Sequence, residues 1–307
     1  MKKYMAFLCL LPTMAMGNLL SDADSQLDIV QTACSGLSDE IASVAGIARV
    51  NTAVTTVGTV AGGGALYAGV QKNTQDKRID EIMTEICQAG GCDVNSVATM
   101  SEQDFFNNIL LPMQQLAEIQ ERTQKSKKLG NWRTGLMAVN SATGVASAVL
   151  SGINRDQSDL IQHATACNIA VSQLSNSYHQ MQTSGINPIT NPIMNKISSI
   201  ITWCTELKVS DLEKIERRMT AVMGTGIGGA VIGATGTGVS AAANTDKIRN
   251  DDSDDGIRRE KRMNTAANVM AGLGTAVGAA GTGVNISVIT LANKMVKQAT
   301  LCEEVLQ

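Results

Sequence analysis

The residues best able to do chemistry are seven cysteines and two histidines. Four residues separate Cys87 from Cys92, so this pair lacks the two-residue spacing of a thioredoxin-type redox motif. Neither His163 nor His179 has a convincing serine or cysteine nucleophile close to it, and Asp159, four residues before His163, predicts an ordinary ion pair. The sequence therefore predicts neither an enzyme active site nor a bound cofactor.

An acidic segment near residue 250 is the strongest candidate for a metal site. Aligned with a calcium-binding EF-hand loop, Asp251, Ser253, Asp255 and Gly256 fall at positions one, three, five and six. Position twelve, which requires a bidentate glutamate, is Arg262. The pattern fails at its strongest ligand, so we predict a solvated connector without a dedicated metal site; weak binding of a divalent ion is the alternative.

The first 17 residues predict a secretory signal peptide. Lys2 and Lys3 precede the apolar run Tyr4–Leu11, and Ala15–Gly17 supplies small residues for cleavage. The apolar run is shorter than the roughly 20 residues that span a bilayer, although an uncleaved anchor is the alternative. We expect export to a bacterial periplasm or cell envelope, where disulfides persist.

Cleavage removes Cys9 and leaves six cysteines, an even number that predicts disulfides. Residues equidistant from the turn of an antiparallel helical hairpin lie at the same level, so cysteines centred on turn signals are candidates for pairing. The turn signals are residues 60–64, 129–131 and the acidic loop 246–262. A rival pair, Cys167 with Cys204, is centred on Gly185. The predicted pairs are Cys34–Cys87, Cys92–Cys167 and Cys204–Cys302.

Four long runs contain no charged residue, and each begins directly after an arginine. Three of the four open alike, as RVNTAV, RMTAV and RMNTAA. The similarity indicates a loosely repeated unit made of a cysteine, an amphipathic helix and a glycine-rich helix. The runs are Val50–Gln71, Thr134–Asn154, Met219–Thr245 and Met263–Asn293.

Glycines inside these runs recur four residues apart. Each glycine weakens an isolated helix by about 1 kcal/mol relative to alanine, so these helices need a packing partner. On a helix, the spacing forms a flat strip that lets another backbone approach closely, as in glycine-zipper segments of bacterial envelope proteins. The segment 224–229 lacks the Lys-Ser/Thr ending of a phosphate loop. The predicted packing residues are Gly58, Gly62, Gly224, Gly228, Gly229, Gly233, Gly274 and Gly278.

No alternating strand pattern bounded by hairpin turns occurs along the chain. We therefore predict an all-α fold of long antiparallel helical hairpins, with Gly/Ala-rich close-packed helices joined by disulfides. The expected organisation is a signal peptide (1–17), an N-terminal helical half (18–184), a Pro/Gly/Asn linker (185–192) and a C-terminal hairpin (193–307).

Two functional interpretations remain open. A net charge of −3 and 3% aromatic residues argue against nucleic-acid binding. The uncharged runs are long enough to cross a membrane, with Trp132 and Trp203 as interface anchors. We expect an exported, non-enzymatic envelope protein that associates with a lipid membrane and with its own copies. The alternative is a soluble periplasmic or secreted helical bundle that binds another protein, with the tryptophans covering its core.

Overall fold

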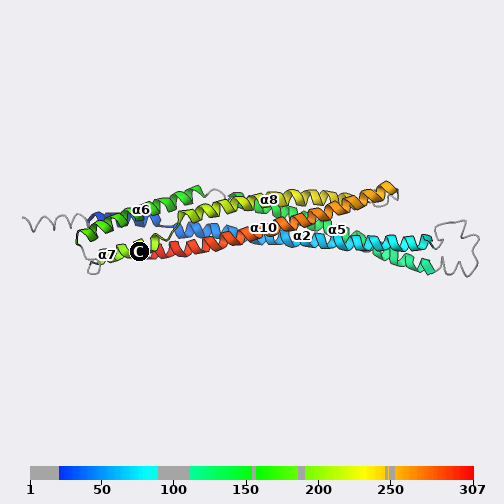
Figure 1. The fold of residues 1–307 in the computed structure, drawn as a ribbon, viewed down its shortest axis with the longest axis horizontal. Coiled ribbons are helices and arrows are strands. Elements are labelled where there is room, and N and C mark those ends of the chain that lie inside the picture. The colour runs from blue at the N-terminus through cyan, green and yellow to red at the C-terminus, as the bar shows by residue number, and fades with distance from the viewer. Residues whose placement is uncertain (1–20, 89–110, 154–156, 186–190, 246–247, 249–252) are drawn as a thin grey trace, which may run out of the picture. The chain divides into compact units, whose positions relative to one another are not determined.

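The computed structural model describes residues 21–88, 111–153, 157–185, 191–245, 248 and 253–307. Within these residues every regular element is a helix, and no β-strand occurs. Residues 21–34 form a first helix, and the longer helices are labelled in Figure 1. The all-α prediction is confirmed, whereas the predicted signal peptide lies outside the described residues. The helices are α2 (Leu37–Gln88), α5 (Leu111–Ile153), α6 (Ser158–Thr183), α7 (Pro192–Cys204), α8 (Val209–Ala243) and α10 (Asp254–Leu306).

The break between α6 and α7 follows from local sequence. Gly185, just after α6, has a φ of +84°, a conformation that favours glycine. Asn191 caps the start of α7, because its side-chain oxygen accepts a hydrogen bond of 3.0 Å from the backbone N–H of Ile193. Pro192 occupies the first turn, where its missing N–H has no effect. The break therefore falls at the predicted linker, of which residues 186–190 lie outside the described part.

The chain divides into two compact units that are discontinuous in sequence. Unit 1 consists of Met1–Thr52, Val149–Met223 and Gly283–Gln307. Unit 2 consists of Ala53–Ala148 and Gly224–Thr282. The helices α2, α5, α8 and α10 contribute residues to both units. This division differs from the predicted halves, since each unit takes segments from both.

The predicted turns at residues 60–64 and 129–131 are wrong, because α2 and α5 run through them without interruption. A Cβ added to Gly62 would lie 2.8 Å from Thr275 Oγ1, and one added to Gly130 would lie 2.3 Å from Asn244 Oδ1. These glycines mark close contacts between helices instead of turns. The predicted acidic loop is also shorter than expected, since α10 begins at Asp254.

Unit 1 has the apolar core expected of a water-soluble helical bundle. Its buried aliphatic side chains come from the first helix, α2, α6, α7, α8 and α10. Ile41, Leu174 and Ile197 are fully buried in it, as are Met219 and Met295. Burying such side chains stabilises a fold by about 1.5–3 kcal/mol each.

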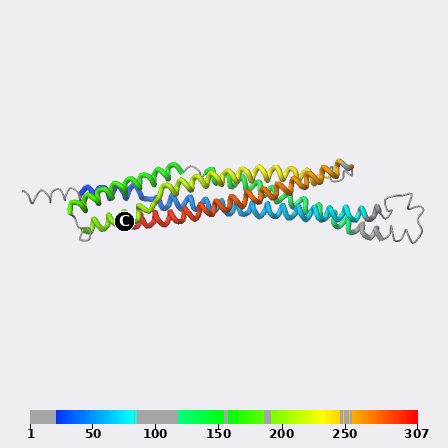
Figure 2. The backbone as a smooth tube through the Cα atoms, viewed as in Figure 1, coloured from blue at the N-terminus to red at the C-terminus, as the bar shows by residue number. Residues whose placement is uncertain are grey.

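Unit 2 is a four-helix bundle with a different interior. Segments of α2, α5, α8 and α10 lie side by side in it (Figure 2). Its apolar core cluster contains only four buried residues, Ala65, Met137, Ala267 and Ala271. Glycine, serine, threonine and asparagine fill much of the remaining contact surface between these helices.

Candidate functional site

Two helix pairs in unit 2 are in backbone contact through glycine. On α5 and α8, a Cβ added to Gly144 would lie 2.4 Å from the backbone nitrogen of Ala230. Reciprocally, a Cβ on Gly226 would lie 2.7 Å from the nitrogen of Ala148. Only glycine permits this approach, because any Cβ would overlap the neighbouring backbone. The glycine-rich runs therefore pack against each other inside one chain.

A second contact joins α2 to α10. A Cβ added to Gly62 would lie 3.0 Å from the nitrogen of Thr275, and one added to Gly278 would lie 2.7 Å from Thr59 Oγ1. The two positions are reciprocal, since each glycine faces a threonine of the other helix. These threonine hydroxyls donate to carbonyls of their own helices, Thr59 to Thr55 and Thr275 to Ala271, both at 2.8 Å. The contact thus leaves neither hydroxyl without an acceptor.

The eight predicted packing glycines differ in their surroundings. Gly58, Gly62, Gly233, Gly274 and Gly278 are the tightly packed ones, with another helix less than 3.0 Å from an added Cβ. The other three are looser. A Cβ added to Gly228 or Gly229 would make ordinary contacts with Val277, and at Gly229 also with Gly144, whereas a Cβ on Gly224 would have no described neighbour within 4 Å. The search for glycines four residues apart missed Gly144 and Gly226, which both lie in close contacts. Gly144 is eight residues from the nearest glycine, and the glycines nearest to Gly226 are two residues away, so neither has a partner at the four-residue spacing.

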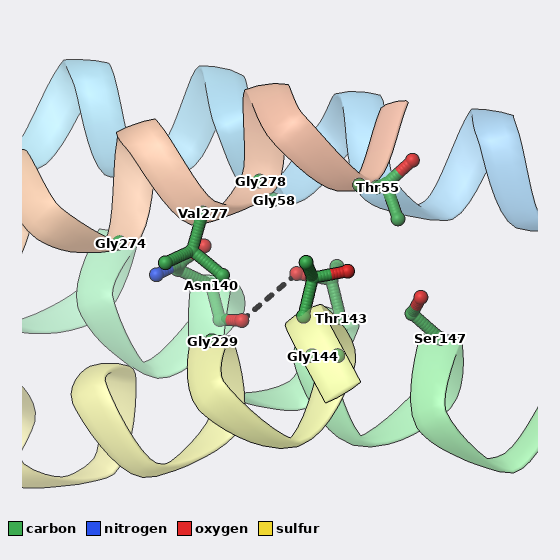
Figure 3. Close-up of a pocket in the computed structure, with 13 residues that line it drawn as sticks. Thr55, Gly58, Asn140, Thr143, Gly144, Ser147, Gly229, Gly274, Val277 and Gly278 are labelled. Atoms are coloured by element: carbon green, nitrogen blue, oxygen red, sulfur yellow. Dashed lines mark hydrogen bonds between the residues drawn. The ribbon is translucent and has the colours of Figure 1, made fainter. Parts of the chain in front are cut away.

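The glycine contacts surround a cavity of about 20 Å³ in unit 2, lined by α2, α5, α8 and α10 (Figure 3). Its lining combines glycines with hydroxyl and amide side chains. Thr55, Asn140 and Ser147 are 7%, 5% and 1% exposed, respectively. Thr143 Oγ1 donates a hydrogen bond of 2.9 Å to the carbonyl of Asn140. Small polar groups therefore occupy a position that aliphatic side chains fill in most soluble bundles.

A buried charged cluster lies elsewhere in unit 2. Lys72 is 1% exposed, and its Nζ lies 2.5 Å from Asp76 and 3.2 Å from Glu260. Ser126 donates a hydrogen bond of 2.5 Å to Asp76. These contacts satisfy a buried ammonium group, which otherwise carries a large desolvation penalty. Partial burial raises the pKa of the nearby Asp80 carboxyl, and repulsion from Asp76 and Glu260 raises that pKa further.

Arg133 is fully buried in the same unit. Its guanidinium donates hydrogen bonds to Ser240 Oγ at 2.9 Å, Asn264 Oδ1 at 2.8 Å and Asn268 Oδ1 at 3.2 Å. The acceptors come from α8 and α10, whereas Arg133 lies on α5. The arginine that precedes an uncharged run in the sequence therefore connects three helices through neutral oxygens.

The cysteine pairing differs from the prediction in unit 1. Cys204 and Cys302 form a disulfide with Cα atoms 4.8 Å apart, as predicted. Cys34 is bonded to Cys167, so the predicted pairs Cys34–Cys87 and Cys92–Cys167 are wrong. The error has the same cause as the misplaced turns, since α2 and α5 continue through their supposed midpoints. Cys92 lies outside the described residues.

The remaining candidate residues show no catalytic arrangement in the part of the chain that the structure describes. His163 Nδ1 lies 3.1 Å from the carboxylate of Glu40, a neighbour on another helix, instead of pairing with Asp159. Of the residues aligned with a calcium-binding loop, Asp255 and Gly256 belong to α10. The close sulfurs of Cys34, Cys167 and Cys302 are accounted for by the two disulfides.

The outward faces of the uncharged runs are apolar. Helical stretches long and apolar enough to cross a membrane occur in four parts of the described chain, within Ser21–Ile82, Glu118–Thr183, Pro192–Ala243 and Asp255–Leu306. Only 22–39% of the residues in these stretches are buried. The exposed apolar side chains of unit 2 include Val57, Val60, Tyr67, Val70, Trp132, Val139, Val145, Ile227, Val231, Val269 and Leu273.

The fold and these contacts define an all-α, disulfide-linked protein with membrane-capable, glycine-packed helices. No protein-family model matches the sequence, and no curated protein or solved structure matches it significantly. A functional assignment must therefore come from the chemistry of the chain itself.

Proposed function

We propose that the chain is an exported, non-enzymatic structural protein of the cell envelope whose four glycine-rich runs cross a membrane. The observation that carries the proposal is the inverted polarity of unit 2. Buried positions hold Asn140, Ser147 and Ser240, whereas exposed positions of the same runs hold valine, isoleucine and leucine. In water this arrangement loses the hydrophobic driving force, but in lipid small and polar residues belong at helix contacts.

The disulfides restrict how such a chain crosses the membrane. Cys34 and Cys167 must lie on one side, so the two runs between them cross together or not at all. The same holds for the two runs between Cys204 and Cys302. Four crossings satisfy both conditions and put all four cysteines on the oxidising, external side.

The distribution of basic residues supports the same orientation. With four crossings, the segments 72–133 and 246–262 lie on the side of the membrane opposite the four disulfide-bonded cysteines, and they carry 14 lysines and arginines. The segments 18–49, 155–218 and 294–307 carry nine. Because basic residues are enriched on the cytoplasmic side, 72–133 and 246–262 are assigned to the cytoplasm.

The alternative function is a soluble periplasmic or secreted bundle that binds another protein, for which the ordinary apolar core of unit 1 is the supporting observation.

Glycine strips that pack within one chain are less available for self-association. Contacts between copies would then use the exposed valines and isoleucines of unit 2 instead.

Membrane fractionation with a carbonate wash separates the two functions. We expect the mature protein to stay in the washed membrane, and its release into the soluble fraction would contradict the proposal. Two matched substitutions sharpen the result. Val231→Lys introduces a charge at a 60% exposed position near the middle of its run, and Ile169→Lys does so at a 54% exposed position of α6 in unit 1.

In a bilayer, Val231→Lys disfavours insertion by about 2.5–3.5 kcal/mol, so the membrane-integrated fraction falls. Ile169→Lys, placed in water by the proposed topology, changes stability by no more than about 0.5 kcal/mol. If neither substitution reduces the integrated fraction, unit 2 does not face lipid.

A further inference from the structure

Exposed basic side chains gather in unit 2 directly before the uncharged runs of α5 and α10. On α5 they lie within the nine residues before the run, and on α10 within the five residues before it. We call this set the basic collar. Its members are Lys125, Lys127, Lys128, Arg258, Arg259, Lys261 and Arg262.

Polar contacts in the interior put the two parts of the collar at one level of the bundle. Ser126 on α5 donates a hydrogen bond to Asp76 on α2. Lys72 binds the same Asp76 and also Glu260 on α10. Because Ser126 and Glu260 lie within the two parts of the collar, both parts surround the bundle just outside its uncharged runs. The α10 part extends over only about 6 Å along the helix axis.

Most of the collar lacks an acidic partner. The carboxylates of Asp76 and Glu260 share the buried Lys72, and Glu121 pairs with Lys125 at 3.5 Å. The acidic side chain of Asp255 lies about one turn farther from the run than the nearest arginine of the collar. The collar residues that form no ion pair with a described carboxylate are Lys128, Arg258, Arg259 and Arg262.

Exposed aromatic rings lie beside the collar. Tyr67 and Trp132 are the aromatic residues that the structure describes in unit 2, and they are 66% and 69% exposed. Trp132 directly precedes Arg133 at the start of its run, and Tyr67 is two residues from Gly69, where an added Cβ would lie 3.2 Å from Arg133 Cδ. Tryptophan and tyrosine are enriched at the level of lipid headgroups. The rings therefore favour a membrane surface over a soluble acidic partner.

We propose that the basic collar binds the headgroups of anionic phospholipids in the leaflet that α5 and α10 enter. This inference rests on the proposed membrane crossing of these helices. Guanidinium groups donate paired hydrogen bonds to phosphate oxygens, and an anionic headgroup, unlike phosphatidylcholine, has no cation of its own to oppose the collar. One basic residue near an anionic membrane surface strengthens binding about fivefold.

Spin-labelled lipids measure this preference in the full mature chain. The protein is reconstituted in phosphatidylcholine bilayers with a trace of labelled phosphatidylglycerol or labelled phosphatidylcholine, and electron paramagnetic resonance reports the fraction immobilised on the protein. We expect phosphatidylglycerol to be preferred by at least about fivefold. Arg258→Gln combined with Arg262→Gln should lower this preference to less than about half.

The matched control neutralises two exposed lysines at the other end of the same run, Lys294→Gln with Lys297→Gln, and should keep most of the preference. Equal losses in the two double variants would overturn the proposal. So would displacement of the labelled lipid by millimolar inorganic phosphate at constant ionic strength, because the site would then bind the free anion.

A carbonate wash of the same vesicles separates this inference from the proposed function. If the unmodified protein stays in the washed bilayer but immobilises both labelled lipids equally, the lipid site alone is wrong. If the wash releases the protein, the membrane crossing is wrong and the lipid site is excluded with it.

Discussion

Replacing Gly144 with alanine tests whether the glycine strips hold unit 2 together. The new Cβ would lie 2.4 Å from the nitrogen of Ala230 and 2.9 Å from the carbonyl oxygen of Gly226. Ordinary contacts begin near 3.4 Å, so α5 and α8 must separate locally by about 1 Å. The obstacle is backbone, which cannot change rotamer to make room.

The free energy of unfolding should fall as a result. Overpacking of this kind costs about 1–3 kcal/mol, and the better helix propensity of alanine returns at most about 1 kcal/mol. We expect a net loss of about 1–2 kcal/mol. Gly135 lies on the same helix, and a Cβ there would have no described neighbour within 4 Å. Gly135→Ala should therefore raise stability by about 0.5–1 kcal/mol.

The assay is thermal unfolding followed by helical circular dichroism, with all variants in the same detergent or buffer. A change of 1 kcal/mol shifts the melting temperature of a domain of 150–250 residues by about 2–4 °C. Gly226→Ala and Gly224→Ala repeat the comparison on α8, only two residues apart. If Gly144→Ala stabilises the protein as much as Gly135→Ala does, α5 and α8 are not in backbone contact and the reasoning fails.

Three further predictions concern charge and covalent structure. Lys72→Met leaves the carboxylates of Asp76 and Glu260 without their shared cation and should lower the free energy of unfolding by about 3 kcal/mol in a denaturant titration. In the same titration Lys77→Met, which removes an ion pair of an 81% exposed lysine, should change it by less than about 1 kcal/mol. Replacing Cys34 and Cys167 with serine opens a loop of 133 residues and should lower stability by about 2–5 kcal/mol, and a reducing agent should then have less effect than on the unmodified protein. Asp80→Asn should raise stability at pH 7, because the raised pKa of the Asp80 carboxyl means that folding disfavours its charged form. The gain should vanish below about pH 4, where this carboxyl is protonated in both the folded and the unfolded state.

The fold class was predictable because it depends on local patterns. Uncharged runs bounded by arginine, charges at helical spacing and the lack of strand alternation all point to long helices. The end of α6 and the start of α7 were also predictable, since Gly185 and Asn191 act on the backbone directly beside them. Such signals do not require knowledge of the neighbouring helix.

The helix partners were not predictable, because glycine has two different structural roles in this chain. At residue 185 it permits a positive φ and ends a helix, whereas at residues 62–64 it lies within a continuous helix beside a neighbour. Composition cannot separate these cases, and treating 60–64 as a turn led to the wrong partner for Cys34. The pairing Cys204–Cys302 was predicted correctly because its midpoint, Ser253, does lie immediately before a new helix, α10.

The proposed four crossings predict which residues a membrane-impermeant reagent can reach. Lys127, on α5, belongs to the segment 72–133 assigned to the cytoplasm, and Gln173, on α6, belongs to the external segment 155–218. Both residues are exposed, so each can carry a single cysteine as a label site. The background chain should have serine at positions 87 and 92, so that the segment contains no other cysteine.

An impermeant maleimide applied to intact cells should label Gln173→Cys and leave Lys127→Cys unmodified. Permeabilising the membrane should then expose Lys127→Cys to the same extent, because its side chain is already solvated. Labelling of both sites in intact cells would exclude crossings by the first two runs, yet would remain compatible with the disulfides, which permit zero, two or four crossings. Because the disulfide holds Cys34 and Cys167 on the same side of the membrane, the two runs between them cross together or not at all. One labelling experiment on α5 and α6 therefore determines whether this pair of runs crosses.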